Sequence, residues 1–177
     1  MTNTTSAPQS LAEEAERVYQ EGDFESAARL YGEAASAFQA LGSTLDSAEM
    51  KNNQSVSFLQ AGNPQSALDA VTGTADIFAD AKDFRRQGIA LANAATPLQS
   101  LGRLDEAVAG YLQASVVFKQ AGDDQLYATV MQAVAGIHLR RGKIFEALSA
   151  QRAGLADLKN PSFTQKIMRG LLRLRLW

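Results

Sequence analysis

The chain has 177 residues, of which 46% are hydrophobic, and this is enough apolar material for a packed core rather than a disordered segment. Its net charge of -2 argues against a protein that binds nucleic acid over its whole surface, because neutralising phosphates requires a basic surface. The absence of cysteine excludes disulfides, thiolate metal sites and cysteine nucleophiles, and no apolar run approaches the ~20 residues that span a bilayer.

The two ends of the chain differ from the middle. The first residues, MTNTTSAPQS, lack both the basic start and the apolar run of a signal peptide, so we expect residues 1–8 to be a disordered polar tail on a cytoplasmic protein. Residues 159–177 carry five basic and no acidic side chains, whereas residues 1–158 carry 12 basic and 19 acidic ones.

A glycine-anchored pattern recurs every 40 residues without a gap. The four copies read GDFESAARLY, GNPQSALDAV, GRLDEAVAGY and GKIFEALSAQ. Self-similarity at a fixed period indicates a stacked array of repeats. The matching positions are small five residues after each glycine (Ala27, Ala67, Ala107, Ala147) and seven before it (Ala15, Ser55, Ala95, Ala135), and large sixteen after it (Phe38, Phe78, Phe118, Leu158).

The spacing within each copy is helical. Small or apolar residues at positions 2, 5, 6, 9, 12 and 16 after each glycine form one stripe of a helix of about 18 residues. The segment before each glycine has the same period, so each repeat is predicted to be two antiparallel helices joined by a glycine turn. Asn63 with Pro64 predicts a helix start, and Ser162 with Gln165 predicts a capping box that opens a last helix from Phe163 to Leu176. Nine helices are expected, with a bend at Pro97.

These residues resemble the tetratricopeptide repeat (TPR) family over residues 9–158. The 40-residue period is longer than the usual ~34 and looks like the long-helix subclass of soluble NSF attachment proteins, kinesin light chains and cell-polarity adaptors, as do Gly42, Ala48 and Asn53. Pro64 and Gln151 depart from the pattern. The resemblance implies an all-α fold, a right-handed α-solenoid of four TPR-like repeats (9–42, 43–82, 83–122, 123–160) followed by a C-terminal amphipathic capping helix within 161–177.

The resemblance also implies a concave groove lined by the first helix of each pair. Asn53 and Asn93 are the best candidates for holding a peptide backbone, because a carboxamide both donates and accepts hydrogen bonds; the alternative is a solvated helix face. We expect alanine at both positions to weaken binding and to leave stability nearly unchanged. The groove residues carried over by position are Glu16, Tyr19, Gln20, Glu49, Asn52, Asn53, Val56, Gln60, Ile89, Asn93, Thr96, Gln99, Ser100, Thr129, Gln132 and Arg140.

One kind of TPR partner is disfavoured. TPR modules that clamp the acidic tails of heat-shock chaperones use lysines and an arginine in the groove, because a carboxylate needs charged partners. The matching positions here lack those cations and hold Ala12, Glu16, Asn53, Ile89 and Asn93.

The basic C-terminal segment allows two interpretations. On a helix, Phe163, Ile167, Leu171 and Leu174 form an apolar edge that could simply cap the last repeat. The alternative is a basic amphipathic helix that contacts an anionic membrane, an acidic partner or a second copy of the chain. The residues that would make this contact are Lys166, Arg169, Arg173, Arg175 and Trp177.

No enzyme chemistry is indicated. His138 is the one histidine, so no histidine-based metal site is expected, and it is predicted to be partly buried and bonded to a neighbouring helix. The acid pairs Asp105–Glu106 and Asp123–Asp124 fall in first helical turns, where the helix dipole explains them, and no phosphate-binding loop is present. We therefore expect no cofactor, no metal and no nucleic acid, and a non-enzymatic adaptor that binds a peptide or helix of a partner protein; the alternative is a membrane-peripheral or self-associating assembly factor.

Overall fold

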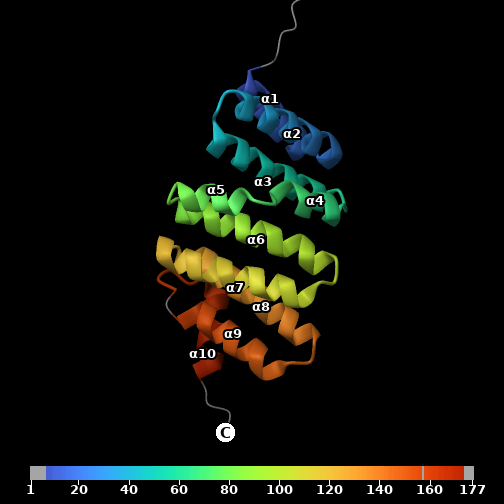
Figure 1. The fold of residues 1–177 in the computed structure, drawn as a ribbon. Helices are drawn as coiled ribbons and strands as arrows, with labels where there is room; N and C mark the ends of the chain where they lie inside the picture. Colours follow the sequence, from blue (N-terminus) through green and yellow to red (C-terminus); the bar gives the residue numbers. More distant parts are fainter. Residues whose placement is uncertain (1–6, 157, 174–177) are drawn as a thin grey trace, which may run out of the picture.

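The computed structural model describes residues 7–156 and 158–173, which form helices stacked along one axis (Figure 1). Over these residues there are ten helical segments and no strand. Their bounds are α1 Pro8–Gln20, α2 Phe24–Ala40, α3 Thr44–Gln60, α4 Pro64–Val71, α5 Thr74–Asp80, α6 Phe84–Ser100, α7 Leu104–Ala121, α8 Asp124–Arg140, α9 Ile144–Ala156 and α10 Phe163–Arg173.

The helices are arranged as successive hairpins. α1 pairs with α2, α3 with α4 and α5, α6 with α7, and α8 with α9, while α10 packs on α9 at the far end (Figure 1). Each hairpin turns at a glycine with a positive φ, from 71° at Gly142 to 86° at Gly22, a backbone conformation that glycine adopts at little cost. The predicted all-α solenoid is therefore confirmed.

The repeated small residues lie where helices approach one another. Ala27, Ala67 and Ala107 are fully buried, because two helices pack closely only where side chains are small. The large side chains Phe78 and Phe118 fill the space beside these contacts and are 1% exposed.

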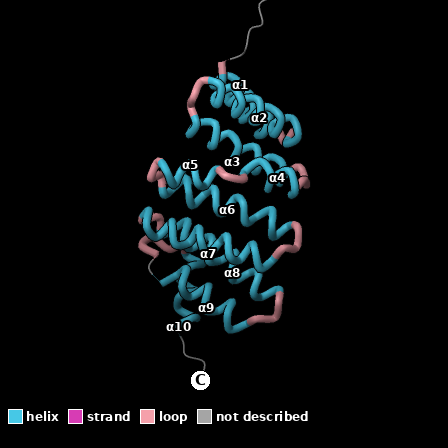
Figure 2. Tube along the Cα trace, in the orientation of Figure 1, coloured by secondary structure: helices cyan, strands magenta, loops and turns pink. Residues whose placement is uncertain are grey.

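One predicted helix is broken in two. The segment after Gly62 was expected to be continuous, but it divides into α4 and α5 at Thr72 and Gly73 (Figure 2). Gly73 has φ 80°, and the buried hydroxyl of Thr74 donates to the carbonyl of Val71 over 2.8 Å. The nine expected helices therefore appear as ten segments, because a glycine inside an apolar stripe allowed the chain to leave the helix.

Side-chain hydrogen bonds cap several of the helix starts. Asp23, Asp83 and Asp123 each accept a hydrogen bond from the backbone three residues later, whereas the Asn63 side chain makes no capping bond. Both bonds of the predicted capping box are present, from Ser162 N–H to Gln165 Oε1 (2.7 Å) and from Gln165 N–H to Ser162 Oγ (3.3 Å).

Three boundaries need comment. α6 continues through the buried Pro97 as one helix. α1 begins at Pro8, inside the range expected to be a tail, because proline suits the first helical turn; the rest of that tail prediction, residues 1–6, lies outside the described residues. The predicted end of the last helix at Leu176 also lies outside them.

Candidate functional site

A small cavity lies between the first repeat and α3. Its volume is about 130 Å³, and Glu16 and Tyr19 of α1, Tyr31 of α2, and Asn53 and Val56 of α3 line it. Four of these five residues belong to the set that the sequence placed in the groove, and Tyr31 is the fifth. The 40-residue repeat brings them together because the same positions of successive first helices lie side by side.

Hydrogen bonds hold two of the polar groups of this cavity, the Glu16 carboxylate and the Tyr31 hydroxyl, in place. The Tyr31 hydroxyl donates to Glu16 Oε2 over 2.7 Å, and Gln20 Nε2 donates to Glu16 Oε1 over 2.6 Å. The bond from Gln20, followed by that from Tyr31, lowers the pKa of the Glu16 carboxyl, while burial and then the nearby Glu16 raise the pKa of Tyr31. Within the described part of the chain no side chain hydrogen-bonds the Asn53 carboxamide, which is half-buried in the cavity lining.

The two other groove asparagines have a structural role. Asn52 is 5% exposed, and its Nδ2 donates to the carbonyl of Ala48 over 2.9 Å. Its Oδ1 accepts a hydrogen bond from Asn93 Nδ2 over 3.2 Å, which joins α3 to α6. The prediction treated Asn53 and Asn93 as equivalent, but the structure gives Asn93 a partner inside the protein.

The cavity has counterparts along the solenoid. Eighty residues on, the hydroxyls of Thr96 and Tyr111 lie 2.9 Å apart at the positions equivalent to Glu16 and Tyr31. At 120 residues on, Gly136 and Gln151 take these positions, and a cavity of about 260 Å³ opens there. Gly136 has no side chain that could occupy this space. The lining residues are Gln132, Ala135, Gly136, Leu139, Ile144, Ala147, Leu148, Gln151 and Met168.

The remaining predicted groove residues are dispersed. Glu49 pairs with Arg86 at 3.0 Å, and Ile89 packs against the core of the third and fourth repeats. Gln99 has a buried side-chain oxygen without a partner among the described residues. Gln132 and Arg140 are exposed on α8.

The predicted C-terminal contact is only partly described. Lys166 is exposed on α10, but Arg169 donates to the carbonyl of Leu158 over 2.7 Å and so ties α10 to the end of the last repeat. Arg175 and Trp177 lie outside the described residues, as does the Arg173 side chain.

His138 is half-buried, as expected. The predicted bond to a neighbouring helix is wrong for Nδ1, which has no hydrogen-bond partner among the described residues. Leu139, next to it, turns outward and is exposed.

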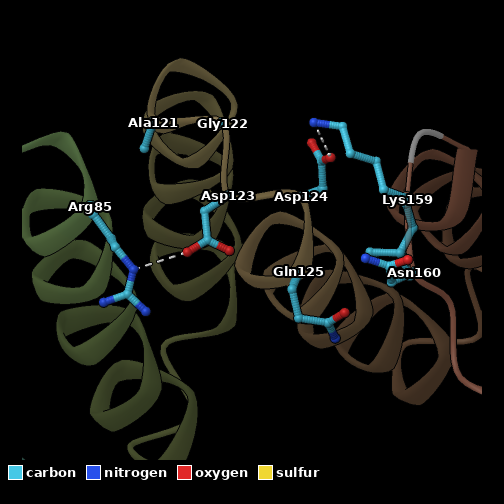
Figure 3. A pocket seen from close by; sticks show the side chains of 9 residues that line it. Arg85, Ala121, Gly122, Asp123, Asp124, Gln125, Lys159 and Asn160 are labelled. Atoms are coloured by element: carbon cyan, nitrogen blue, oxygen red, sulfur yellow. Dashed lines mark hydrogen bonds and ion pairs between the residues drawn. The ribbon is translucent and has the colours of Figure 1, made fainter.

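A third cavity, of about 330 Å³, lies where the third and fourth repeats meet (Figure 3). The adjacent residues Asp123 and Asp124 point in opposite directions there: Asp123 meets Arg85 of α6 at 3.1 Å, and Asp124 meets Lys159 at 3.4 Å (Figure 3). Because each carboxylate is paired with a basic side chain of a neighbouring segment, we assign this region to the contact between repeats rather than to ligand binding.

Neither a metal centre nor a membrane span is found in the described ranges. No group of three or more acidic or histidine side chains is placed to hold a metal ion there. None of the helices there is both long and apolar enough to traverse a bilayer.

The stacked hairpins and the first-helix cavities define a TPR-like helical repeat protein, a class that typically serves as a protein-interaction scaffold. The model of the soluble NSF attachment protein (SNAP) family matches residues 3–152, so the chain belongs to that family. Comparison with curated protein sequences gave no match.

Solved structures share the fold at low sequence identity. One contains TPR-like repeats described as kinesin light chain from Podosopora anserina, with 15% identity, a TM-score of 0.73, and coverage of 97% of this chain and 87% of that one. Another is BtubC (BKLC) from P. vanneervenii, with 19% identity, a TM-score of 0.73, and coverage of 89% of this chain and 68% of that one.

Proposed function

We propose that the chain is a non-enzymatic adaptor that holds an extended or helical segment of a partner protein against its first helices. The cavity around Asn53 supports this most directly. It combines a carboxamide without a side-chain partner among the described residues, the half-buried ring of Tyr19 and the apolar Val56, with Glu16 fixed beside them. Such a surface recognises a peptide through amide hydrogen bonds and shape rather than through ion pairs.

The family name agrees with this function. SNAP proteins are named for attachment, in their case of NSF. We propose that attachment of another protein is the activity that this chain shares with them, with a partner that its own groove residues select.

Site-specific photo-crosslinking tests the proposal. A photoreactive residue at position 53 should capture one protein in the native cell, identifiable by mass spectrometry, and position 19 should capture the same protein. The matched control is Gln113, which is exposed on the second helix α7. Capture of the same protein at 113 as at 53 would contradict a groove site.

The captured protein then allows a direct measurement. Asn53→Ala should weaken its binding to the purified chain by ~3- to 10-fold, the value of one or two lost hydrogen bonds. Unchanged affinity would remove Asn53 from the site.

A further inference from the structure

The exposed surfaces at the two ends of the solenoid differ in polarity. At the first end, the outer side of α1 carries Arg17 between Glu14 and Glu21, all solvent-exposed and ion-paired. A polar outer face of this kind is typical of the terminal repeat of an array, because it is exposed to water. At the other end most of the exposed large apolar side chains gather on α8, α9 and α10: Leu139, Ile144, Phe145, Leu148, Phe163, Ile167 and Met168.

A cavity lies within this apolar end. It is the 260 Å³ space beside Gly136, whose lining apart from Gln132 and Gln151 consists of aliphatic side chains, methionine and glycine. Leu139 is 62% exposed and Ile144 58% exposed at its mouth. An added Cβ at Gly136 would meet no atom within 4 Å, which shows that the space above this residue is open.

The preceding repeat shows what kind of element covers this surface. One repeat earlier, Leu104 and Val108 occupy the positions of Ile144 and Leu148, and they pack against a core that includes Val130 and Val134 of α8. The ion pair between Arg141 and Asp105 places the end of α8 over the start of α7. A helix is therefore the element that this surface accommodates.

α10 packs on α8 and α9 at a different place from the surface around Gly136. Its Thr164 and Gln165 lie beside Ala128 and Gly154, and Leu172 packs near Leu155. The surface from Leu139 to Leu148 keeps its apolar side chains exposed, with Met168 of α10 at its border.

Charge indicates the chemistry of the helix that would fit. Residues 138–177 contain nine basic and two acidic residues, whereas residues 1–137 contain eight basic and 17 acidic ones. Arg140 follows Leu139, Lys143 precedes Ile144, and Lys166 lies on α10, two residues before Met168. In the described ranges none of these three cations lies within 4.0 Å of a carboxylate oxygen, and Glu146 is the acidic residue nearest in the chain to Arg140 and Lys143.

We propose that an acidic amphipathic helix of a partner protein docks across the start of α9 and the end of α8, and that it places one large apolar side chain in the cavity beside Gly136. The inference rests on the proposed adaptor function and adds to it the place and chemistry of one contact. The apolar face of the helix replaces water over Leu139, Ile144 and Leu148, and its acidic flanks meet Arg140, Lys143 and Lys166.

Two synthetic peptides of the same length as α8, 17 residues, test this with the full chain. Both carry leucine and phenylalanine on one helical face; the other face carries glutamate in one peptide and lysine in its control. Fluorescence anisotropy should show binding of the glutamate peptide, about tenfold or more weaker binding of the lysine peptide, and weakening of the former with salt.

Filling the cavity gives the specific test. At Gly136 an added Cβ meets nothing within 4 Å, so Gly136→Met can extend its side chain into the open space and should lower affinity for the glutamate peptide by about tenfold or more. The matched control is Gly170→Met on α10, where an added Cβ also meets nothing within 4 Å, and its affinity should equal that of the original chain. Circular dichroism should show both variants folded, because methionine favours a helix more than glycine does.

Several outcomes would overturn the inference. Equal binding of the two peptides would show that charge does not determine peptide binding. Wild-type affinity in Gly136→Met would show that the cavity does not determine it. Three results would assign another occupant: dimers that Gly136→Met disrupts in sedimentation, binding to phosphatidylserine vesicles that the same variant abolishes, or tighter peptide binding after deletion of residues 174–177.

The same peptide titration with Asn53→Ala separates the two proposals. If Asn53→Ala binds the glutamate peptide with wild-type affinity but binds the protein captured by crosslinking more weakly, both proposals are supported. Loss of peptide binding in Gly136→Met with no crosslink at position 53 would retain the C-terminal contact and overturn the groove around Asn53.

Discussion

Asn93 on α6 donates a hydrogen bond to Oδ1 of Asn52 on α3, 3.2 Å away, and thereby joins two first helices of the solenoid. The side-chain amide nitrogen of Asn52 in turn donates a hydrogen bond to the carbonyl of Ala48. The pair is thus a polar contact between repeats, next to the half-buried Asn53 that lines the cavity of the first repeat.

Alanine at these positions should therefore have different effects. Asn93→Ala leaves the buried Oδ1 of Asn52 without its donor, so we expect it to lower the free energy of unfolding by about 1–2 kcal/mol. Asn53→Ala, whose carboxamide has no such bond, should change it by less than about 0.5 kcal/mol. Urea denaturation of both variants checks this, and equal stabilities would show that the Asn52–Asn93 bond contributes nothing.

Two helical glycines should respond in opposite ways to alanine. At Gly136 a Cβ meets nothing within 4 Å, so Gly136→Ala should stabilise the protein by about 0.5–1 kcal/mol through helix propensity. At Gly88 a Cβ would lie 2.6 Å from the Phe118 ring, which is 1% exposed and cannot easily move. Gly88→Ala should destabilise by about 1–3 kcal/mol in spite of the same propensity gain. Thermal melts of both variants provide the measurement, and stabilisation by Gly88→Ala would show that the helices can separate there.

The fully buried Ala107 on α7 marks a helix crossing. Ala107→Leu should cost about 1–3 kcal/mol by overpacking, since no space is left for the added atoms. The control is Ala109→Leu, two residues on and exposed on the same helix, which should be nearly neutral. Similar losses in both variants would contradict the assignment of Ala107 to the crossing.

Asp83 should contribute a pH-dependent part of the stability. The backbone N–H of Arg86, followed by the Arg86 guanidinium, lowers the pKa of the Asp83 carboxyl below its usual range. Because the folded pKa is the lower one, the stabilisation is present above the ordinary aspartate pKa of about 3.9 and is lost as the pH falls through the folded value.

The Asp83→Asn variant tests the direction of this pH dependence of stability. Asparagine can still cap α6 but does not titrate, so wild type should be the more stable protein at pH 6, and the gap should shrink as the pH falls below 3. Urea denaturation at both pH values measures the gap. A gap that stays constant or widens in acid would contradict the assignment.

The fold was predictable because its determinants are local and repeated. The glycine turns, the buried alanines and the Ser162–Gln165 capping box each depend on residues a few positions apart, and four copies reinforce one another. The break at Thr72 and Gly73 was not predicted, because Phe78 keeps its buried position and the apolar stripe continues across the gap.

The candidate site was less predictable, because its partners lie a full repeat apart. The sequence placed Glu16, Asn53 and Val56 on suitable helices, but it could not show that Asn93 is bonded to Asn52, 41 residues away. A signal for the cavity beside Gly136 was nevertheless present: the position of Glu16, Val56 and Thr96 becomes glycine in the last copy.

The interruption of the second repeat also affects how the array holds together. α4 and α5 have eight and seven residues, lengths at which a helix has little stability of its own, so this hairpin depends on α3 and α6 to stay folded. In an array whose units are stabilised by nearest neighbours, a weak unit lowers cooperativity across it. We therefore expect hydrogen exchange in denaturant to reveal two folding blocks, one on either side of Gly73, rather than a single all-or-none unit.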